Sequence, residues 1–205
     1  MKPQSEQQLI KSFGKKLPPA FYERADVVII AWELLGKILV THIDYQLTAG
    51  RITETEAYNG AFDKASHAFG NRRTKRTEVM YGSGGTAYIY LCYGLHQMFN
   101  VVTNISDIPN AVLIREIEPV AGNDVMLQRL KKTIHKPGLT KGPGNVGKAL
   151  GIHTAQSGMS LQSNELFIAD DGFSFSTNEI AITKRIGVDY AAEDALLPYR
   201  FVVER

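Results

Sequence analysis

The sequence has only one cysteine, Cys92, among its 205 residues. No disulfide can form within the chain, and a reducing compartment is the simpler expectation. A site built from several thiolates is excluded as well, and the five histidines show none of the paired spacings that metal sites use. We therefore expect neither a metal ion nor any other cofactor.

Long apolar runs are also missing. No segment is long enough to cross a bilayer, and residues 1–8 lack the apolar core of a signal peptide. These absences predict a soluble protein of the cytoplasm with no membrane partner.

Acidic residues are missing from two stretches of the chain, although the net charge is only +2. So small a net charge does not by itself require a nucleic-acid partner. No acid occurs at positions 64–77 or 125–164, where the basic residues are Lys64, Arg72, Arg73, Lys75, Arg76, Arg129, Lys131, Lys132, Lys136, Lys141 and Lys148. Each stretch alone fits a solvated face as well as a surface for a polyanion.

Two common catalytic motifs are absent. No serine lies in a strand–turn–helix elbow, and Cys92 lies in an aromatic, strand-like run, so a nucleophilic serine or cysteine is not indicated. Residues 142–149 have the glycine and lysine spacing of a phosphate-cradling loop, but Ala149 stands where such a loop needs a hydroxyl for magnesium. A helix start that touches backbone phosphate and a simple tight turn both remain compatible with this segment.

The length predicts one domain over residues 1–205, with residues 1–16 as a loosely ordered lead. Asp26 is expected to cap a helix at 27–35 that Gly36 ends. A turn begins at Pro119 and leads to a helix at 124–132, and a short helix lies within 141–151. Strands are expected at 37–43, 50–58, 86–92, 97–103, 111–117, 166–168, 179–183 and 199–203, and residues 59–85 form a long loop.

The run 51–58 carries two acids and a ring. It alternates like a strand, so Glu54, Glu56 and Tyr58 should share one face, and Ile52 should lie on the same face. Two carboxylates close together also occur in enzymes that cleave sugars. Two exposed glutamates on a half-buried strand would give the same pattern, so these acids alone do not decide between the two interpretations.

Aromatic residues gather downstream of this run. Tyr88 and Tyr90 share a face of a second strand, and Tyr93 lies in the turn of the expected hairpin. His67 and the basic residues at 71–76 lie between the two strands in sequence. Each tyrosine alone is typical of a half-buried core position, but together with the basic loop they indicate a surface on which a base can stack. The pattern predicts a pocket for a flat group attached to a polyanion.

Several segments, in one order along the chain, resemble the alkyladenine (3-methyladenine) DNA glycosylases, of the mammalian alkyladenine type that also occurs in bacteria. The matching segments are Thr53–Tyr58, Asp63–His67, Arg72–Arg76, Gly85–Asn100, Val112–Arg115 with Glu118 and Pro119, Lys141–Gly144 and, more weakly, Arg185–Val188 and Pro198–Phe201. The resemblance implies an α+β fold, a single domain around a curved, open-barrel-like antiparallel sheet. Helices would flank the sheet, and a protruding hairpin would enter the minor groove.

The resemblance also implies roles for the pocket residues. Glu56 would be the general base, and Arg115 would help to hold the water and the acid. The rings of Tyr58, His67 and Tyr90 would hold the extruded base. For His67, a place in the wall, a hydrogen bond to the base and a structural role all remain open. Asn100 would screen the pocket against the amino group of guanine.

Contacts to duplex DNA follow from the same resemblance. Tyr93 would fill the gap that the extruded nucleotide leaves. The backbone would be contacted by the basic residues Arg72, Arg73, Lys75, Arg76 and Lys141. Leu95 and His96, which follow the wedge, differ from the mammalian pattern, so the lesion range and the partner contacts do not follow from the resemblance.

The resemblance implies a monofunctional glycosylase of base excision repair, without lyase activity. It would release 3-methyladenine, 7-methylguanine and also deaminated or etheno purines from double-stranded DNA. It would act as a monomer, and in a bacterium it would associate with the nucleoid. Two other functions fit parts of the pattern: a non-catalytic binder of distorted duplex, and a glycoside hydrolase that uses Glu54 and Glu56.

Overall fold

The structure, a computed structural model, describes residues 6–204. The first five residues of the expected lead lie outside this range. Within the rest of the lead, helix α1 (Glu6–Ser12) is followed by strand β1 (Lys15–Lys16), which pairs with a later strand. Phe13, between these two elements, is buried. The described part of the lead is thus joined to the fold by strand pairing and by a buried ring.

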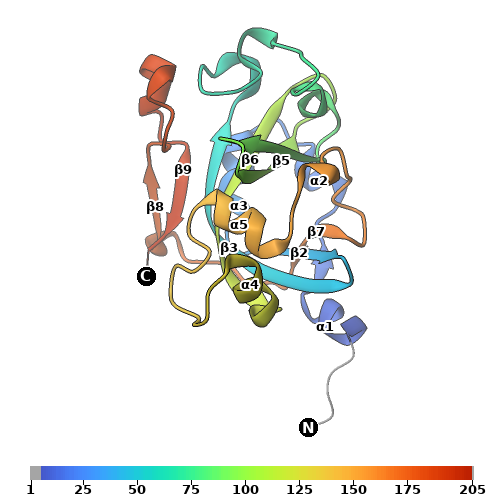
Figure 1. Ribbon diagram of the computed structural model, residues 1–205. Coiled ribbons are helices and arrows are strands. Elements are labelled where there is room, and N and C mark those ends of the chain that lie inside the picture. Colours follow the sequence, from blue (N-terminus) through green and yellow to red (C-terminus); the bar gives the residue numbers. More distant parts are fainter. Residues whose placement is uncertain (1–5, 205) are drawn as a thin grey trace.

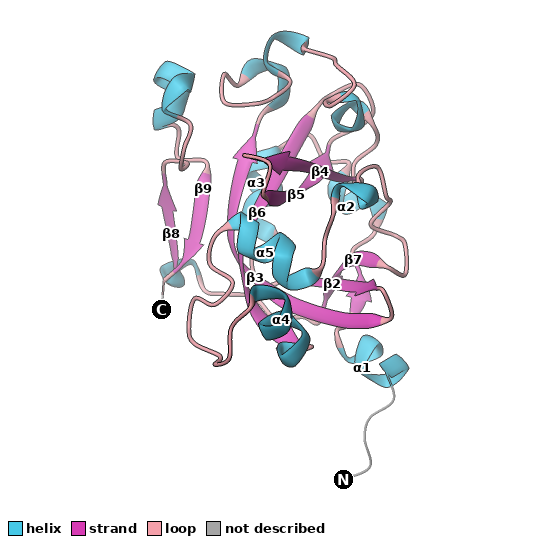
Figure 2. Ribbon diagram, viewed as in Figure 1, coloured by secondary structure: helices cyan, strands magenta, loops and turns pink. Residues whose placement is uncertain are grey.

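The remaining elements form one antiparallel sheet with helices packed against it (Figures 1 and 2). They are α2 (Pro19–Tyr22), α3 (Val27–Glu33), β2 (Ile38–Ile43), β3 (Gln46–Tyr58), β4 (Ala87–Cys92), β5 (His96–Thr103), β6 (Asn110–Ala121), α4 (Asn123–Leu130), α5 (Pro143–Leu150), β7 (Leu166–Asp170), β8 (Ile180–Thr183) and β9 (Arg200–Val203). The strand order is β1-β7-β2-β3-β6-β5-β4, and the hairpin β8–β9 joins through β9 to β3. The α+β fold around a curved antiparallel sheet is confirmed.

Helix α3 begins where the sequence predicts. The Asp26 side chain accepts hydrogen bonds from the backbone N–H groups of Val28 and Ile29, which satisfies donors that the first turn leaves free. The chain reverses after the helix at Gly36, whose φ of +86° favours glycine. The helix lies on β3, where the Thr55 hydroxyl donates to the Ala31 carbonyl at 2.8 Å. This contact fixes the strand that carries both predicted acids.

The alternation of side chains along β4, β5 and β6 gives the sheet two different faces. One face packs against α3 and α5 in the main core and carries Ala87, Ile89, Phe99, Val101, Val112 and Ile114. The opposite face carries Tyr88, Tyr90, Asn100, Leu113 and Arg115, which line a cavity. The same strands therefore build both the core and the candidate site.

Strand β3 departs from simple alternation. Ile52 lies opposite Ile117 and Glu54 lies opposite Glu116, so the register shifts between them and again after Glu54. Ile52 consequently joins Ala57 in the main core. The prediction that Ile52 shares a face with the two glutamates is therefore wrong, because a strand irregularity between positions 52 and 55 changes which residues face the core.

Two other expectations need correction. Pro119 begins no turn: it lies inside β6 opposite Gly50, next to a further register shift, where a ladder hydrogen bond is already interrupted. The strands expected at 37–43 and 50–58 leave residues 44–49 for a turn, but β2 and β3 are joined by Asp44 and Tyr45 alone, both with positive φ.

The long loop at 59–85 is irregular, as expected, but it contains the short 3₁₀ helices Gly60–Phe62, Phe69–Asn71 and Glu78–Tyr81. It contributes to the cavity face, and so does the segment at 185–197, which includes the 3₁₀ helix Asp189–Leu196. Two more such helices, Thr154–Gln156 and Thr177–Glu179, lie elsewhere. The candidate site thus lies between the sheet and these two covering segments.

Segment 142–149, the possible phosphate loop, forms most of α5. Gly147 serves packing, because a Cβ added there would lie 2.2 Å from the Gln97 carbonyl oxygen of β5. Val146, Ala149 and Leu150 are buried in the main core. Close contact between a helix and a strand accounts for this glycine at position 147.

Candidate active site

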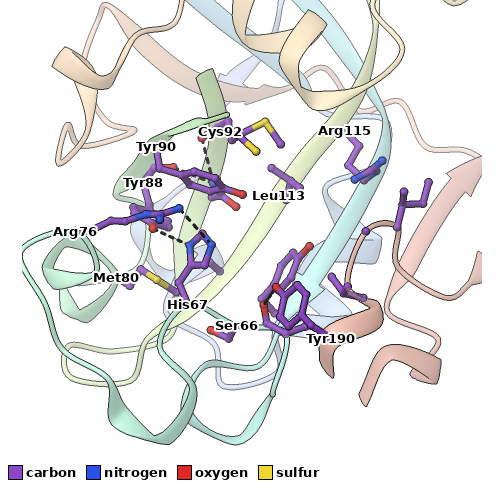
Figure 3. A pocket seen from close by; sticks show the side chains of 18 of the residues that line it. Ser66, His67, Arg76, Met80, Tyr88, Tyr90, Cys92, Leu113, Arg115 and Tyr190 are labelled. Atoms are coloured by element: carbon purple, nitrogen blue, oxygen red, sulfur yellow. Dashed lines mark hydrogen bonds between the residues drawn. The ribbon is translucent and has the colours of Figure 1, made fainter. Parts of the chain in front are cut away.

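A cavity of about 330 Å³ opens on the face of the sheet away from the main core. Strands β3 to β6 supply one wall, and the loop at 59–85 and the segment at 185–197 supply the rest. Figure 3 shows His67 and Tyr90 close together on one side and Tyr190 on another, and Arg115 belongs to the same lining. The volume suits one flat heterocycle rather than an oligosaccharide chain.

Glu56 lies behind the wall of this cavity and is 0 % exposed. Its Oε1 accepts a hydrogen bond from the Ile186 backbone N–H at 2.8 Å. Its Oε2 accepts from the Tyr58 hydroxyl at 2.8 Å and from Arg115 Nη1 at 3.3 Å. All three partners line the cavity, whereas Glu56 itself does not. The carboxylate is therefore one hydrogen bond away from the cavity.

Burial raises the pKa of Glu56 above its ordinary value, because a charged carboxylate loses its hydration. The positive charge of Arg115 and the hydrogen bonds from Ile186 and Tyr58 oppose this rise. The pKa of the Tyr58 hydroxyl is raised as well. Burial is the larger cause, and the negative charge of Glu56 is the second. The arrangement favours a basic carboxylate beside a neutral phenol.

Glu54 anchors the arginine rather than lining the cavity. Its Oε1 accepts from Arg115 Nε at 2.7 Å and from Arg200 Nε at 2.7 Å, and Glu54 is 1 % exposed. Arg115 thus bridges Glu54 and Glu56 with two different nitrogen atoms. Both guanidinium groups bind the same Glu54 oxygen, and Glu54 is not part of the cavity lining. The geometry does not support a sugar-cleaving pair.

A second buried ion pair fixes the covering segments. Arg185 and Asp63 are joined by two hydrogen bonds, one of them 2.9 Å long from Nη2 to Oδ1. Arg185 also donates to the Ala57 carbonyl at 2.9 Å, and its guanidinium lies 4.8 Å from the centre of the Tyr58 ring. This pair orders the chain just before Ile186 and so places the N–H group that Glu56 accepts.

The predicted rings come together in the cavity. The centres of the His67 and Tyr90 rings lie 4.7 Å apart at an interplanar angle of 74°, and those of Tyr88 and Tyr90 lie 5.5 Å apart. Tyr58 lines the same cavity from β3. The structure therefore brings together Tyr58, His67 and Tyr90 from three separate segments.

His67 is a neutral imidazole at neutral pH. Burial, followed by the charges of Arg76 and Arg72, lowers the pKa of His67 to about 4. Its Nε2 lies 3.3 Å from Arg76 Nη2, which can only donate, so Nε2 is the accepting nitrogen. Nδ1 then carries the proton and donates to the Tyr88 hydroxyl at 2.9 Å. Both nitrogens are engaged, and the ring is held as part of the wall.

Asn100 lines the cavity at the floor formed by β5. Its Nδ2 donates to the carbonyls of Tyr88 (3.1 Å) and Met98 (3.2 Å), and the residue is 4 % exposed. These two bonds fix the amide plane. The Asn100 side chain is therefore held in one orientation at the cavity wall.

Tyr93 projects from the tip of the hairpin formed by β4 and β5. It is 90 % exposed, and the next large residue, Leu95, is 78 % exposed. Tyr93 and Gly94 both have positive φ, +50° and +70°, and the Leu95 N–H donates to the Cys92 carbonyl, which is the pattern of a type I′ turn. A tyrosine in this backbone region carries strain of about 1–2 kcal/mol. An exposed, strained ring at the mouth of a cavity is a candidate for contact with a ligand.

The predicted basic residues differ in availability. Arg72, Lys75 and Lys141 are exposed. Arg73 is engaged: it donates two hydrogen bonds to Glu78 and one to Asp107, and its guanidinium lies 4.6 Å from the centre of the Tyr81 ring. Its role in this structure is to hold the loop.

Several residues of the site were not predicted. They are Met80, Ile186 and Tyr190 in the cavity lining, and Asp63, Arg185 and Arg200 in the ion pairs behind it. The segments that contain Asp63, Arg185 and Arg200 do belong to the motif matches. Their pairing has no sequence signal, because 122 positions separate Asp63 from Arg185.

Two negative observations complete the description. Within residues 6–204, no group of three or more His, Cys, Asp or Glu side chains is placed to hold a metal ion. Over the same part of the chain, no helix has the length and apolar character to cross a membrane.

Comparison with known proteins adds independent findings. Residues 20–205 match the family model described as "Methylpurine-DNA glycosylase (MPG)". A Chlamydia abortus protein named "Putative 3-methyladenine DNA glycosylase" is 48% identical over 189 residues, which cover 91% of this chain and 97% of that protein. A Desulfitobacterium hafniense protein of the same name is 45% identical over 197 residues, 93% of this chain and 96% of that protein. One from Bacillus mycoides is 45% identical over 196 residues, 92% of this chain and 96% of that protein.

Proposed function

The chain belongs to the methylpurine-DNA glycosylase family, whose members hydrolyse N-glycosidic bonds, and we propose that it excises 3-methyladenine and 7-methylguanine from duplex DNA during base excision repair. The family predicted from the motifs is confirmed. Deaminated and etheno purines belong to the same proposal, because the cavity has room for one flat heterocycle and its aromatic rings would stack on a π face rather than select one set of substituents.

Glu56 is the proposed general base. Water attacks C1′ of the deoxyribose while the N-glycosidic bond breaks and its electron pair leaves with the base. The Glu56 carboxylate takes the proton of the water and stabilises the positive charge that develops on the sugar. Arg115 opposes the rise in the pKa of Glu56 and so favours the ionised carboxylate. The water would reach Glu56 where Tyr58, Arg115 and Ile186 meet in the cavity wall.

The rings give the proposed preference for alkylated purines. A 3-methyladenine or 7-methylguanine nucleotide carries positive charge, and the faces of tyrosine rings attract cations by about 0.5–2 kcal/mol. A neutral His67 adds a flat surface without adding a charge that would repel the base. The same positive charge weakens the bond between base and sugar.

The proposed duplex contacts use the exposed tip and the exposed cations. Tyr93 would enter the stack and offset the cost of extruding the nucleotide, which is a few kcal/mol. Arg72, Lys75 and Lys141 would contact phosphates, whereas Arg73 is left out because acids already hold it. No lysine lines the cavity in the described residues, so no imine with the sugar and no strand cleavage are expected.

The observation that carries the proposal is the buried Glu56 carboxylate one hydrogen bond from an aromatic cavity. The test is Glu56→Gln, assayed by alkali-sensitive sites in duplex DNA with one 3-methyladenine or hypoxanthine. Base release should fall at least about a hundredfold, while binding to the lesion duplex stays nearly unchanged. The exposed Glu23→Gln is the matched control and should release base at the wild-type rate. Equal release by wild type and Glu56→Gln would reject this assignment.

The alternative function, a non-catalytic binder of distorted duplex, predicts a different result. Wild type would then bind the lesion duplex without releasing any base. A buried carboxylate with a raised pKa, placed beside the cavity, is not needed for binding alone.

A further inference from the structure

Arg76 occupies part of the cavity in which the base is proposed to bind. Its guanidinium lies 4.7 Å from the centre of the Tyr90 ring, and its Nη2 lies 3.3 Å from His67 Nε2 (Figure 3). The π face of Tyr90 and the Nε2 atom of His67 are two of the groups that a bound purine would contact. Arg76 therefore makes the same contacts with Tyr90 and His67 that a bound cationic base would make.

Arg76 is held weakly compared with its neighbour. Arg73, three positions earlier, is paired with both Glu78 and Asp107. For Arg76, in contrast, no carboxylate of the described residues lies within the 4.0 Å of an ion pair. Its loop position is exposed. A guanidinium without a carboxylate partner can leave its place without leaving a buried acid unpaired.

A place to which the guanidinium can move lies next to the cavity. A second hollow shares Ser66, His67 and Arg76 with the cavity and is also lined by Lys64 and Arg72. Lys64 is paired with Glu193, but Arg72 and Arg76 have no ion pair in the described part of the chain. Two guanidinium groups beside one hollow suit a phosphate group of the DNA backbone. Arg76 lines both hollows, so a change of its rotamer transfers its charge from the base site to the phosphate site.

We propose that Arg76 is a charged gate of the base cavity: its guanidinium occupies the base site until a backbone phosphate draws it into the neighbouring hollow. This inference rests on the proposed function, because it assumes that the cavity receives a base. While the Arg76 guanidinium lies in the base site, its charge repels cationic bases that carry no phosphate. A cationic base within DNA is attached to a backbone phosphate, and this phosphate draws the Arg76 guanidinium out of the base site. Arg76 is thus a specificity-determining residue that favours cationic bases in a strand over cationic bases that carry no phosphate.

The test uses two free bases that lack phosphate. 3,9-Dimethyladeninium is a permanent cation, and 9-methyladenine is its neutral counterpart of similar shape. In Arg76→Met, which keeps most of the side-chain length but no charge, affinity for the cation should rise about tenfold, because like-charge repulsion is removed and the Tyr90 face is open. Affinity for 9-methyladenine should rise by no more than about threefold. Calorimetric titration of the intact protein measures both.

Arg76→Lys is the matched control, since it keeps the positive charge. Its ratio of affinities for the two bases should stay within about twofold of wild type. Three results for Arg76→Met would each overturn the gate. They are an unchanged ratio of affinities for the two bases, an equal gain in affinity for both bases, and no measurable binding of the cation.

A second readout does not depend on ligand or catalysis. Arg76, Arg72, Tyr88 and Tyr90 surround His67, and the charge of Arg76 contributes to its lowered pKa. In Arg76→Met, the pKa of His67 followed by NMR should rise from about 4, and in Arg76→Lys it should rise less. If wild type releases no base from DNA, the proposed function fails. The affinities of the Arg76 variants for the two bases and the pKa of His67 still test the role of Arg76.

Discussion

The two faces of the same sheet are stabilised by different interactions. The core face carries apolar side chains such as Phe99, Val112 and Ile114, all 0 % exposed. The cavity face carries Glu54 and Arg115, which are buried almost as deeply but charged. Burial alone therefore does not distinguish core from site. What distinguishes the site is that its buried groups are ionisable and are held by partners from distant segments.

The buried charges on the cavity side are arranged in pairs. A buried charge without a partner costs several kcal/mol, so each acid near the cavity has at least one arginine. Of these acids, the pKa of Glu56 is shifted upward despite its partner. The acid that is proposed to act as a base is thus buried in an environment that raises its pKa.

The largest expected effect comes from breaking a pair on the cavity side. Arg185→Met leaves Asp63 buried without its guanidinium, and the free energy of unfolding should fall by about 3–5 kcal/mol. Urea denaturation measures the loss. Adding Asp63→Asn should restore most of it, because the uncompensated charge is then removed. A double variant no more stable than Arg185→Met would contradict an electrostatic origin.

A smaller effect is expected from two neighbouring positions of β6 that face opposite ways. Ile114→Ala, on the core face, should lower the free energy of unfolding by about 2–5 kcal/mol while base release per folded molecule stays near wild type. Leu113→Ala, on the cavity wall, should cost less stability because its side chain already borders open space. Base release should change more in Leu113→Ala than in Ile114→Ala. The reverse order would contradict the assignment of the two faces.

The smallest expected effect is a pH dependence on the cavity side. The pKa of His67 falls from 6.5 to about 4 on folding, so the unfolded chain binds its proton at higher pH than the folded protein does. Stability should therefore rise as pH increases from about 4 to 6.5, since the unfolded state holds more protons in this window. His67→Gln should remove this rise, as measured by thermal unfolding across the window. Glu23→Gln, at an exposed position, serves as the control and should keep it.

The elements of the fold were largely predictable, because they follow from local rules. Asp26 caps a helix, as expected for a capping residue that precedes apolar residues at helical spacing. Strand β4, which carries Tyr88 and Tyr90 on one face, alternates as expected. The prediction failed for Ile52, since a register shift in β3 arises from pairing with β6 and leaves no mark in the spacing of residues. Pro119 misled for a related reason: a proline is tolerated inside a strand next to such a shift.

The candidate site was predictable in part of its membership but not in its arrangement. The rings at 58, 67 and 90 do line one cavity with Arg115 and Asn100. The position of Glu56 behind that wall was not predictable, and neither was the place of Arg76 inside it. Both depend on atoms that approach each other only after the covering segments have folded over the sheet.

The sequence by itself determined the α+β class, the two-sided strands and the family, because side-chain alternation, helix capping and ordered motifs are properties of neighbouring residues. Only the tertiary structure decided which groups control the acid and the cavity. The Ile186 N–H reaches Glu56 across 130 positions, and Arg200 reaches Glu54 across 146. Such contacts have no local signal, since their energy depends on burial and on distances that exist only in the folded chain.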